Sequence, residues 1–376
     1  MRILQIHNKY IYAGGEDSVV EEEAELLISK GHEIIQLFKD NSKINSLYQK
    51  IDILINLPYS NNSKKILIDK LNEIEKPDIV HIHNLFPLWT YSILEILKEK
   101  NIPVVMTLHN YRLLWHNLGL FDKEAKKYGY FKNSRIKTFF ISRWFSKYRR
   151  LLNRVDKFIV LTDFMKEKFE NAGFSKTKLI VKPNFIKKKN VILKEINNKN
   201  DAIFASRISR EKGIFTLLKA WSNLNLKLKI YGDGPDSKSI IQKNKNTNIF
   251  FNGQISRDSL MKEISYSKFL IFPSEWFECL PMTIIEAFRE STLVLASDIG
   301  SIKSIIKHKF NGILFKPGDD DDLKKKVEWI LNNPKDCDNI VKNALNQFNE
   351  LYTDEINYKY LVKLYNDVIE SHKQRL

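Results

Sequence analysis

Short apolar runs alternate along most of the chain with longer segments in which apolar residues recur every three or four positions. The short runs predict β-strands, and the longer segments predict amphipathic helices. Strands expected in the first half are residues 2–7, 32–38, 78–83, 103–108, 157–162 and 178–181. Strands expected in the second half are residues 202–206, 226–231, 248–252, 269–272, 293–297 and 313–315. Strands that alternate with helices indicate an α/β fold with parallel sheets.

The two sets of strands also indicate how the chain divides into domains. A chain of 376 residues is longer than one ordinary domain and suits two of about 180 residues each. Pro183 and Asn184 lie between the two sets and mark the expected hinge. We therefore predict two doubly wound domains, residues 1–184 and 185–353, followed by a C-terminal helical segment, residues 354–376.

One stretch of the second half, residues 270–288, reads LIFPSEWFECLPMTIIEAF and places two glutamates at a strand–loop–helix corner. Pro281 suits the first turn of a helix, because its missing N–H group would be unpaired there anyway. Glu278 is therefore expected just before a helix N-terminus, and Glu286 within that helix. Free N–H groups at such an end attract anions and oxygen-rich ligands. The spacing of the two carboxylates by itself is also typical of solvated surface groups.

Two basic residues follow the first strand of the second half. Arg207 and Lys212 are five positions apart in the sequence SRISREKG, between the strand end and a helix expected near Ile214. A diphosphate needs such an arrangement of two fixed cations beside the free N–H groups of a helix. The segment therefore predicts a diphosphate site, with a solvated loop as the alternative.

The first half carries two further candidate sites at strand ends. Gly14 and Gly15 follow the first strand, where glycine lets the backbone approach a ligand closely, although a plain turn could use the same residues. His109 follows strand 103–108 in the sequence TLHNYR. Open α/β sheets place their ligand sites at the carboxyl ends of their strands, so His109 is a candidate for ligand contact. A lone histidine in other settings is usually structural.

Charge adds a prediction about partners. The formal net charge of +16 implies an anionic partner, which could be a nucleotide, a nucleic acid or a lipid surface. Residues 123–157 contain twelve Lys or Arg and two Asp or Glu, so about ten of the sixteen charges lie there. Within this region, residues 138–155 predict an amphipathic helix with a basic edge. Such a helix suits an anionic membrane surface, and it equally suits packing in the domain with a solvated basic edge.

Other features of the sequence bear on location and on metals. The chain opens on a strand, no apolar run reaches the roughly 18 residues of a membrane span, and the two cysteines make no disulfide framework. We therefore expect a cytoplasmic protein. No group of residues has metal-ligand spacing, so no metal site is expected.

Taken together, these motifs resemble those of retaining glycosyltransferases with the GT-B fold, and of family 4 (group 1) in particular. The resemblance rests on PSEWFE…P…IIEAF, on S-R-x-x-x-x-K-G and on T-x-H-N-Y-R. It implies two Rossmann-like domains that face each other across a cleft. The N-terminal domain would take the acceptor, the C-terminal domain would bind the sugar donor, and the last helix would cross back to the N-terminal domain.

The resemblance also implies roles for the residues that match its motifs. Glu286 would bond the ribose hydroxyls, and Arg207 and Lys212 would neutralise the diphosphate as it leaves, in place of a metal. Glu278 would hold the sugar hydroxyls together with the backbone N–H groups of Cys279 and Leu280.

The remaining roles that the resemblance implies belong to the first half. Gly14 and Gly15 would border the diphosphate and the acceptor. His109 would bond the 6-hydroxyl of the sugar rather than act as a base. The residues expected to act in catalysis are then Glu278, His109, Arg207 and Lys212.

The expected substrate is a nucleotide-diphosphate sugar, with UDP preferred to GDP, and the expected acceptor is a glycan or a polyprenyl-linked glycan of a bacterial surface polysaccharide, such as capsule or lipopolysaccharide. Residues 135–157 would bind an anionic membrane at the inner face of the plasma membrane, and no nucleic acid is expected. Two alternatives remain open. One is a basic protein of the GT-B fold that binds membrane or nucleic-acid surfaces. The other is a GT-B-fold sugar-nucleotide epimerase, which would need paired carboxylates and histidines.

Overall fold

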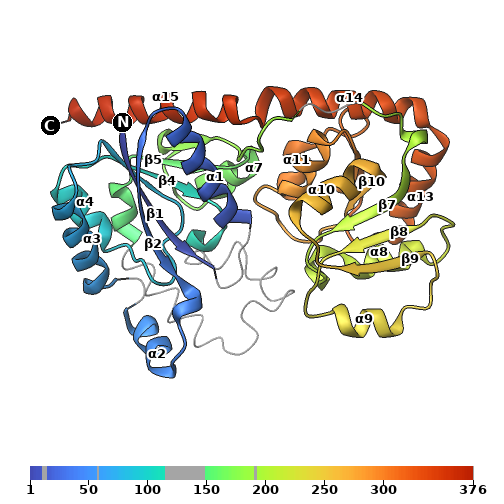
Figure 1. Ribbon diagram of the computed structural model, residues 1–376, viewed down its shortest axis with the longest axis horizontal. Helices are drawn as coiled ribbons and strands as arrows, with labels where there is room; N and C mark the ends of the chain where they lie inside the picture. The colour runs from blue at the N-terminus through green and yellow to red at the C-terminus, as the bar shows by residue number, and fades with distance from the viewer. Residues whose placement is uncertain (11–14, 57–58, 115–148, 190–192, 376) are drawn as a thin grey trace. The chain divides into compact units, whose positions relative to one another are not determined.

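A computed structural model describes residues 1–10, 15–56, 59–114, 149–189 and 193–375. The chain forms two compact units. Unit 1 comprises Met1–Pro183 and Asn357–Leu376, and unit 2 comprises Asn184–Ile356. Figure 1 shows the elements of both units.

Unit 1 is built on a six-stranded parallel sheet in the order β2-β1-β3-β4-β5-β6. Its strands are β1 (Arg2–Lys9), β2 (Glu33–Asp40), β3 (Ile79–Ile82), β4 (Val104–Leu108), β5 (Lys157–Val160) and β6 (Leu179–Val181). Its helices are α1 (Gly15–Ser29), α2 (Leu47–Asn56), α3 (Asn61–Glu73), α4 (Ile93–Glu99) and α7 (Asp163–Asn171). The 3₁₀ turns η1 (Asn41–Lys43), η2 (Arg112–Leu114), η3 (Arg149–Arg154) and η4 (Lys176–Lys178) complete the unit.

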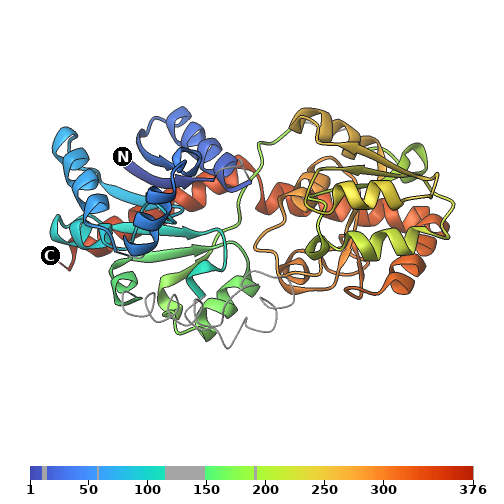
Figure 2. The same ribbon diagram turned by 90° about the horizontal axis from the view of Figure 1, so that it is seen from below.

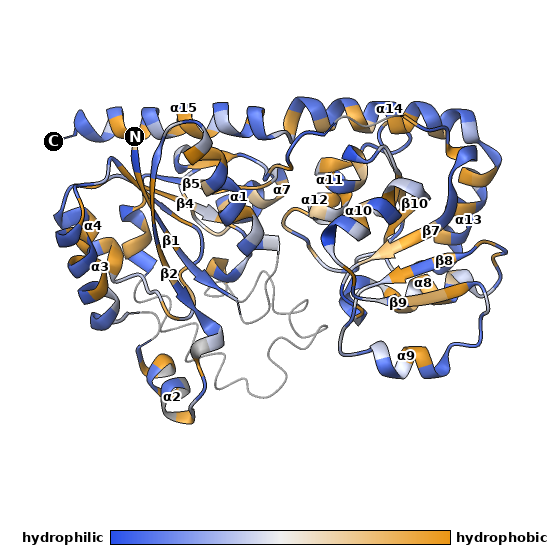
Figure 3. Ribbon diagram, viewed as in Figure 1, coloured by the Kyte–Doolittle hydropathy of each residue, from blue (hydrophilic) through white to orange (hydrophobic). Residues whose placement is uncertain are grey.

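The C-terminal helix α15 (Asp354–Lys373) joins the core of unit 1. Its apolar positions recur at helical spacing, and the helix alternates hydrophobic and hydrophilic patches along its length (Figure 3). Leu361, Tyr365 and Val368 are buried against Ile3 of β1 and Val105 of β4. A segment far away in the sequence therefore closes one face of the N-terminal sheet.

Unit 2 is a second six-stranded parallel sheet, in the order β12-β11-β10-β7-β8-β9. Its strands are β7 (Asn200–Ala205), β8 (Leu228–Tyr231), β9 (Ile249–Gly253), β10 (Ser267–Phe272), β11 (Leu293–Ser297) and β12 (Ile313–Phe315). Its helices are α8 (Ile214–Trp221), α9 (Ser237–Lys243), α10 (Arg257–Tyr266), α11 (Met282–Arg289), α12 (Gly300–Ile305), α13 (Asp320–Asn332) and α14 (Pro334–Leu351), with 3₁₀ turns η5 (Ile196–Asn198) and η6 (Arg210–Lys212). The helices cover both faces of the sheet (Figure 2).

The core of unit 2 is built on strands whose residues are almost all apolar, as expected for parallel strands that are buried on both faces. One cluster joins side chains of β7, β10 and β11 to α8, α13 and α14. On the other face, Ile284, Ile285 and Phe288 of α11 are completely buried. The α/β prediction with two doubly wound sheets is confirmed.

Helix α1 begins at Gly15, so Gly15 is a helical residue rather than part of a loop, and Gly14 lies outside the described residues. Glu16 and Asp17 favour a helix start at this point, because acidic side chains stabilise the first turn of a helix.

Most of the basic segment 135–157 also lies outside the described residues. Its described end, η3, is a 3₁₀ turn rather than the end of an α-helix, and it buries Leu151 and Leu152. This end therefore packs in unit 1. Of the helices that the structure describes, none combines the length and the hydrophobicity needed to cross a membrane.

Candidate active site

Each sheet has one point where the strand order reverses. In unit 2 the chain runs from β7 outward to β9, and then from β10 outward to β12, with β7 and β10 adjacent. In doubly wound sheets the loops diverge at such a point and leave a crevice for ligands at the carboxyl ends of the strands. The loops after β7 and β10 carry most of the predicted site residues.

Glycines bring the loops of unit 2 into close contact. Gly213 has a φ of +74°, and a Cβ atom there would lie 1.8 Å from the carbonyl oxygen of Pro273 in the loop after β10. A Cβ atom on Gly234, in the turn after β8, would lie 2.2 Å from the carbonyl oxygen of Ile208. Only glycine fits such contacts. The sequence GDGP after β8 thus serves backbone geometry.

Lys212 and Glu278 meet at this reversal point. The Nζ atom of Lys212 lies 2.7 Å from Oε1 of Glu278, and the hydroxyl of Ser274 donates to the same oxygen at 2.8 Å. The Lys212 and Glu278 side chains are 20% and 15% exposed. A cation and a carboxylate are therefore both accessible at the crevice, although they are 66 positions apart in the sequence.

The other two charged candidates of unit 2 also have partners. Arg207 is 57% exposed and pairs with Glu211 through Nη2 at 3.1 Å. Glu286 lies on α11 with its side chain 9% exposed, and Arg257 at the start of α10 contacts its Oε1 at 3.1 and 3.2 Å. An ion pair as exposed as that of Arg207 contributes only about 0–1 kcal/mol, so a charged ligand can compete with Glu211 for Arg207.

The segment between β10 and α11 ends in an open helix terminus. Pro281 occupies the N-cap position of α11 and provides no side-chain cap. Cys279 is half-buried and Leu280 is buried just before it. The first N–H groups of α11 therefore lie at the end of the same loop as Glu278, which is favourable for an oxygen-rich ligand.

His109 lies at the carboxyl end of β4 in unit 1, as predicted. Its Nε2 atom is 3.1 Å from Nδ1 of His83, and the two ring planes lie 22° from parallel with centroids 5.4 Å apart. Burial lowers the pKa of His109 to about 3. The imidazole is therefore neutral at any ordinary pH, which suits a hydrogen-bonding group better than a general base.

A polar group beside His109 was not predicted from the sequence. Glu16, in the first turn of α1, accepts a hydrogen bond from the Tyr10 hydroxyl at 2.8 Å. The Asn110 amide donates to that hydroxyl at 3.3 Å, and the Arg112 guanidinium lies over the Tyr10 ring at 5.1 Å. Burial raises the pKa of Glu16 to about 7. The HNYR sequence was the available signal, because Asn110 and Arg112 follow His109 directly.

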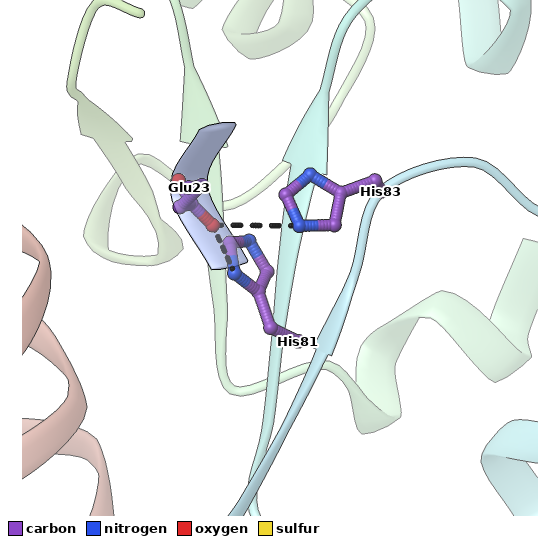
Figure 4. A group of neighbouring side chains, drawn as sticks. All are labelled: Glu23, His81 and His83. Carbon is purple, nitrogen blue, oxygen red and sulfur yellow. Dashed lines mark ion pairs between the residues drawn. The ribbon is translucent and has the colours of Figure 1, made fainter. Parts of the chain in front are cut away.

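A second unpredicted group lies deeper in unit 1, where β1 and β3 are adjacent and the strand order reverses. Glu23 of α1 points at His81 of β3 and at His83, which directly follows that strand, as Figure 4 shows. All three side chains are buried. Lys182, which follows β6, approaches Glu23 to 3.6 Å and is also buried. Sequence spacing could not reveal this cluster, since its members come from three separate elements.

Comparisons with known proteins agree with this architecture. Residues 13–189 match the family model described as Glycosyltransferase Family 4, and residues 185–347 match the model described as glycosyl transferases group 1. An uncharacterized glycosyltransferase of Methanocaldococcus jannaschii is 29% identical over 265 residues, which cover 69% of this chain and 67% of that protein. An uncharacterized protein from the cps region of Klebsiella pneumoniae is 25% identical over 340 residues, covering 81% and 87%.

A solved structure shows the same fold. Anabaena HepE in complex with UDP superposes with a TM-score of 0.68 at 15% identity, covering 97% of this chain and 100% of that chain. The two sheets, the C-terminal helix of unit 1 and the family models together define a GT-B glycosyltransferase. The chain belongs to the group 1, family 4-type glycosyltransferases, as the sequence motifs predicted.

Proposed function

We propose that this glycosyltransferase moves a sugar from a nucleotide-diphosphate sugar to its acceptor with retention of the anomeric configuration and without a metal ion. The observation that carries the proposal is the pairing of Lys212 with Glu278 at the strand-order reversal of unit 2, with Arg207 in the same loop as Lys212. A diphosphate and a sugar need this combination, because phosphate oxygens require cations whereas sugar hydroxyls require acceptors.

The proposed chemistry assigns one task to each group. Lys212 and Arg207 stabilise the negative charge that develops on the leaving diphosphate, which is the part that a metal ion plays in other transferases. Glu278 accepts hydrogen bonds from the sugar hydroxyls, and Glu286 accepts them from the ribose. The acceptor hydroxyl attacks the anomeric carbon on the face that the diphosphate leaves, and a phosphate oxygen takes its proton. His109, which is neutral, bonds the sugar's 6-hydroxyl.

The proposal extends to the substrates. Uracil is the proposed base of the donor, which is supported by the UDP bound to Anabaena HepE. The proposed acceptor is a glycan or a polyprenyl-linked glycan of a bacterial surface polysaccharide. The Klebsiella relative from a cps region supports that pathway. Residues 135–157 would then hold the enzyme at an anionic membrane.

Thermal unfolding with UDP, GDP, ADP or CDP, each in the presence of EDTA, tests the donor site. A nucleotide at 100 times its dissociation constant should add about 2.7 kcal/mol to the free energy of unfolding. We expect UDP to stabilise the protein most. Equal stabilisation by all four that disappears in salt would contradict a specific site and favour a basic surface that binds anions.

The stereochemical part of the proposal has a separate test. Proton NMR of the product formed from an α-linked UDP-sugar, with EDTA present, should show an α-linkage. A β-linked product would refute retention, and activity that returns only with a divalent cation would refute metal independence.

A further inference from the structure

A buried carboxylate connects to His109 through a second histidine. Glu23 is 2% exposed, and its Oε1 atom lies 3.5 Å from Nε2 of His83. The other ring nitrogen of His83, Nδ1, lies 3.1 Å from Nε2 of His109. Figure 4 shows the first part of this row, with Glu23 directed at His81 and His83.

The charge of Glu23 decides where His83 carries its proton. Burial by itself would raise the pKa of Glu23, but His81 and Lys182 outweigh it and leave that pKa below its ordinary value. Glu23 is therefore an anion. A neutral imidazole has one N–H group and one lone pair. An N–H at Nε2 of His83 is attracted by the carboxylate 3.5 Å away, whereas a lone pair there would be repelled.

The proton on His83 then decides the tautomer of His109. With its proton at Nε2, His83 presents a lone pair at Nδ1. Two lone pairs facing each other at 3.1 Å would repel and leave both rings without a hydrogen bond, so His109 must donate from Nε2. The Nδ1 atom of His109 is left as an acceptor. Among the described residues, it has no hydrogen-bond partner.

We propose that Glu23, acting through His83, is a positioning residue that holds His109 in the Nε2–H tautomer and so presents the Nδ1 lone pair to the sugar donor. The substrate part rests on the proposed function. A lone pair accepts a hydrogen bond from a hydroxyl but repels a carboxylate. The arrangement therefore selects a sugar with a neutral 6-hydroxyl over a uronic acid.

A metal ion is the competing explanation of the same cluster. Ligand atoms of Glu23, His81 and His83 all lie within 4.8 Å of one another. The surroundings do not fit a divalent cation, because the Lys182 ammonium already lies 3.6 Å from Glu23. Both nitrogens of His81 also have partners, the hydroxyls of Thr107 at 2.8 Å and Tyr365 at 2.7 Å.

NMR of the full chain with ¹⁵N-labelled histidine reads the tautomers directly, without any substrate. In the wild type we expect His83 and His109 to show a protonated Nε2 and an unprotonated Nδ1. A protonated Nδ1 on either ring would overturn the proposal. Stoichiometric zinc in the purified protein by elemental analysis would also overturn it, because Nε2 of His83 would then be a metal ligand.

Substitution of the carboxylate tests its role. In Glu23→Gln, the charge that separates the two tautomers is lost, so the His109 resonances should shift towards a mixture. The double variant Glu23→Gln, Lys182→Met removes one negative and one positive charge, so the net charge of the cluster is unchanged. It provides the test if the single variant does not fold. Asp17→Asn is the matched control, since Asp17 pairs with a different buried histidine, His7, at 2.7 Å. Unchanged His109 resonances in a folded Glu23 variant would refute the relay.

Binding of UDP-glucose and UDP-glucuronate to the wild type tests selection at the sugar. We expect UDP-glucose to bind at least tenfold more tightly, and equal affinity would refute the selection. If the wild type did not bind UDP at all, that result would instead contradict the proposed function, while the tautomer measurement would still stand. The two proposals therefore fail separately.

Discussion

Replacing Lys212 by methionine separates a role in binding from a role in stability. The Nζ atom of Lys212 contacts Glu278 at 2.7 Å, and the side chain is 20% exposed. In the free protein its loss should cost about 1 kcal/mol or less, because the pair is part-exposed. Glu278 also keeps the hydrogen bond from the hydroxyl of Ser274. The unfolding temperature of Lys212→Met should therefore fall by at most a few degrees.

The effect on nucleotide binding should be larger. A hydrogen bond to a charged group contributes about 1.5–3 kcal/mol. Part of this is offset, because the diphosphate must draw Lys212 away from Glu278. A net loss of about 1.4–2.8 kcal/mol corresponds to a tenfold to hundredfold increase in the Kd of UDP. Isothermal titration calorimetry with EDTA present measures this change.

Lys229→Met is the matched control for Lys212→Met. Lys229 pairs with Glu263 at 3.0 Å in the same unit and is 34% exposed, but it lies on β8 rather than in the loops of the crevice. We expect wild-type affinity for UDP in this control. The reasoning is refuted if folded Lys212→Met binds UDP as the wild type does, or if both variants weaken binding equally.

Three further predictions concern single positions. Glu286→Gln should weaken UDP binding about tenfold and leave the affinity for inorganic pyrophosphate unchanged by calorimetry, since pyrophosphate has no ribose. The pKa of His109 falls from 6.5 to about 3 on folding, so the unfolded chain binds a proton at a higher pH than the folded chain does. The free energy of unfolding should therefore drop as pH falls below about 6.5. Thermal unfolding should show a less steep drop for His109→Gln. Gly213→Ala should lower the unfolding temperature and abolish UDP binding, because its Cβ would meet Pro273 at 1.8 Å.

Each of these predictions has a distinct contradictory outcome. Equal weakening of UDP and pyrophosphate by Glu286→Gln would place Glu286 away from the ribose. Identical pH profiles for wild type and His109→Gln would show that His109 is not buried in its neutral form. Gly253→Ala is the control for Gly213→Ala, since its φ is +68° but no atom lies within 4 Å of the added Cβ. It should cost only about 1–2 kcal/mol, from backbone strain.

Much of the fold followed from local sequence. Apolar runs bounded by glycine, proline and polar residues specify parallel strands, because a strand buried on both faces needs apolar residues at every position. The carboxyl ends of such strands face the ligand in doubly wound sheets. Arg207, Lys212, Glu278 and His109 could therefore be assigned to strand ends before any contact was known.

What only the tertiary structure decided is which of these groups meet. Lys212 and Glu278 are far apart in the sequence and become partners because β7 and β10 are neighbours in the sheet. Glu23 reads as one acid in the run EEEAE of an amphipathic helix, which usually indicates a solvated face.

Glu23 is instead buried beside His83 and Lys182, because helix α1 and the ends of β3 and β6 converge at one place in unit 1. Local sequence carries the periodicity of an element and the chemistry of its side chains. It does not carry the distances between elements, and those distances set the charge of a buried carboxylate and the tautomer of the histidines beside it.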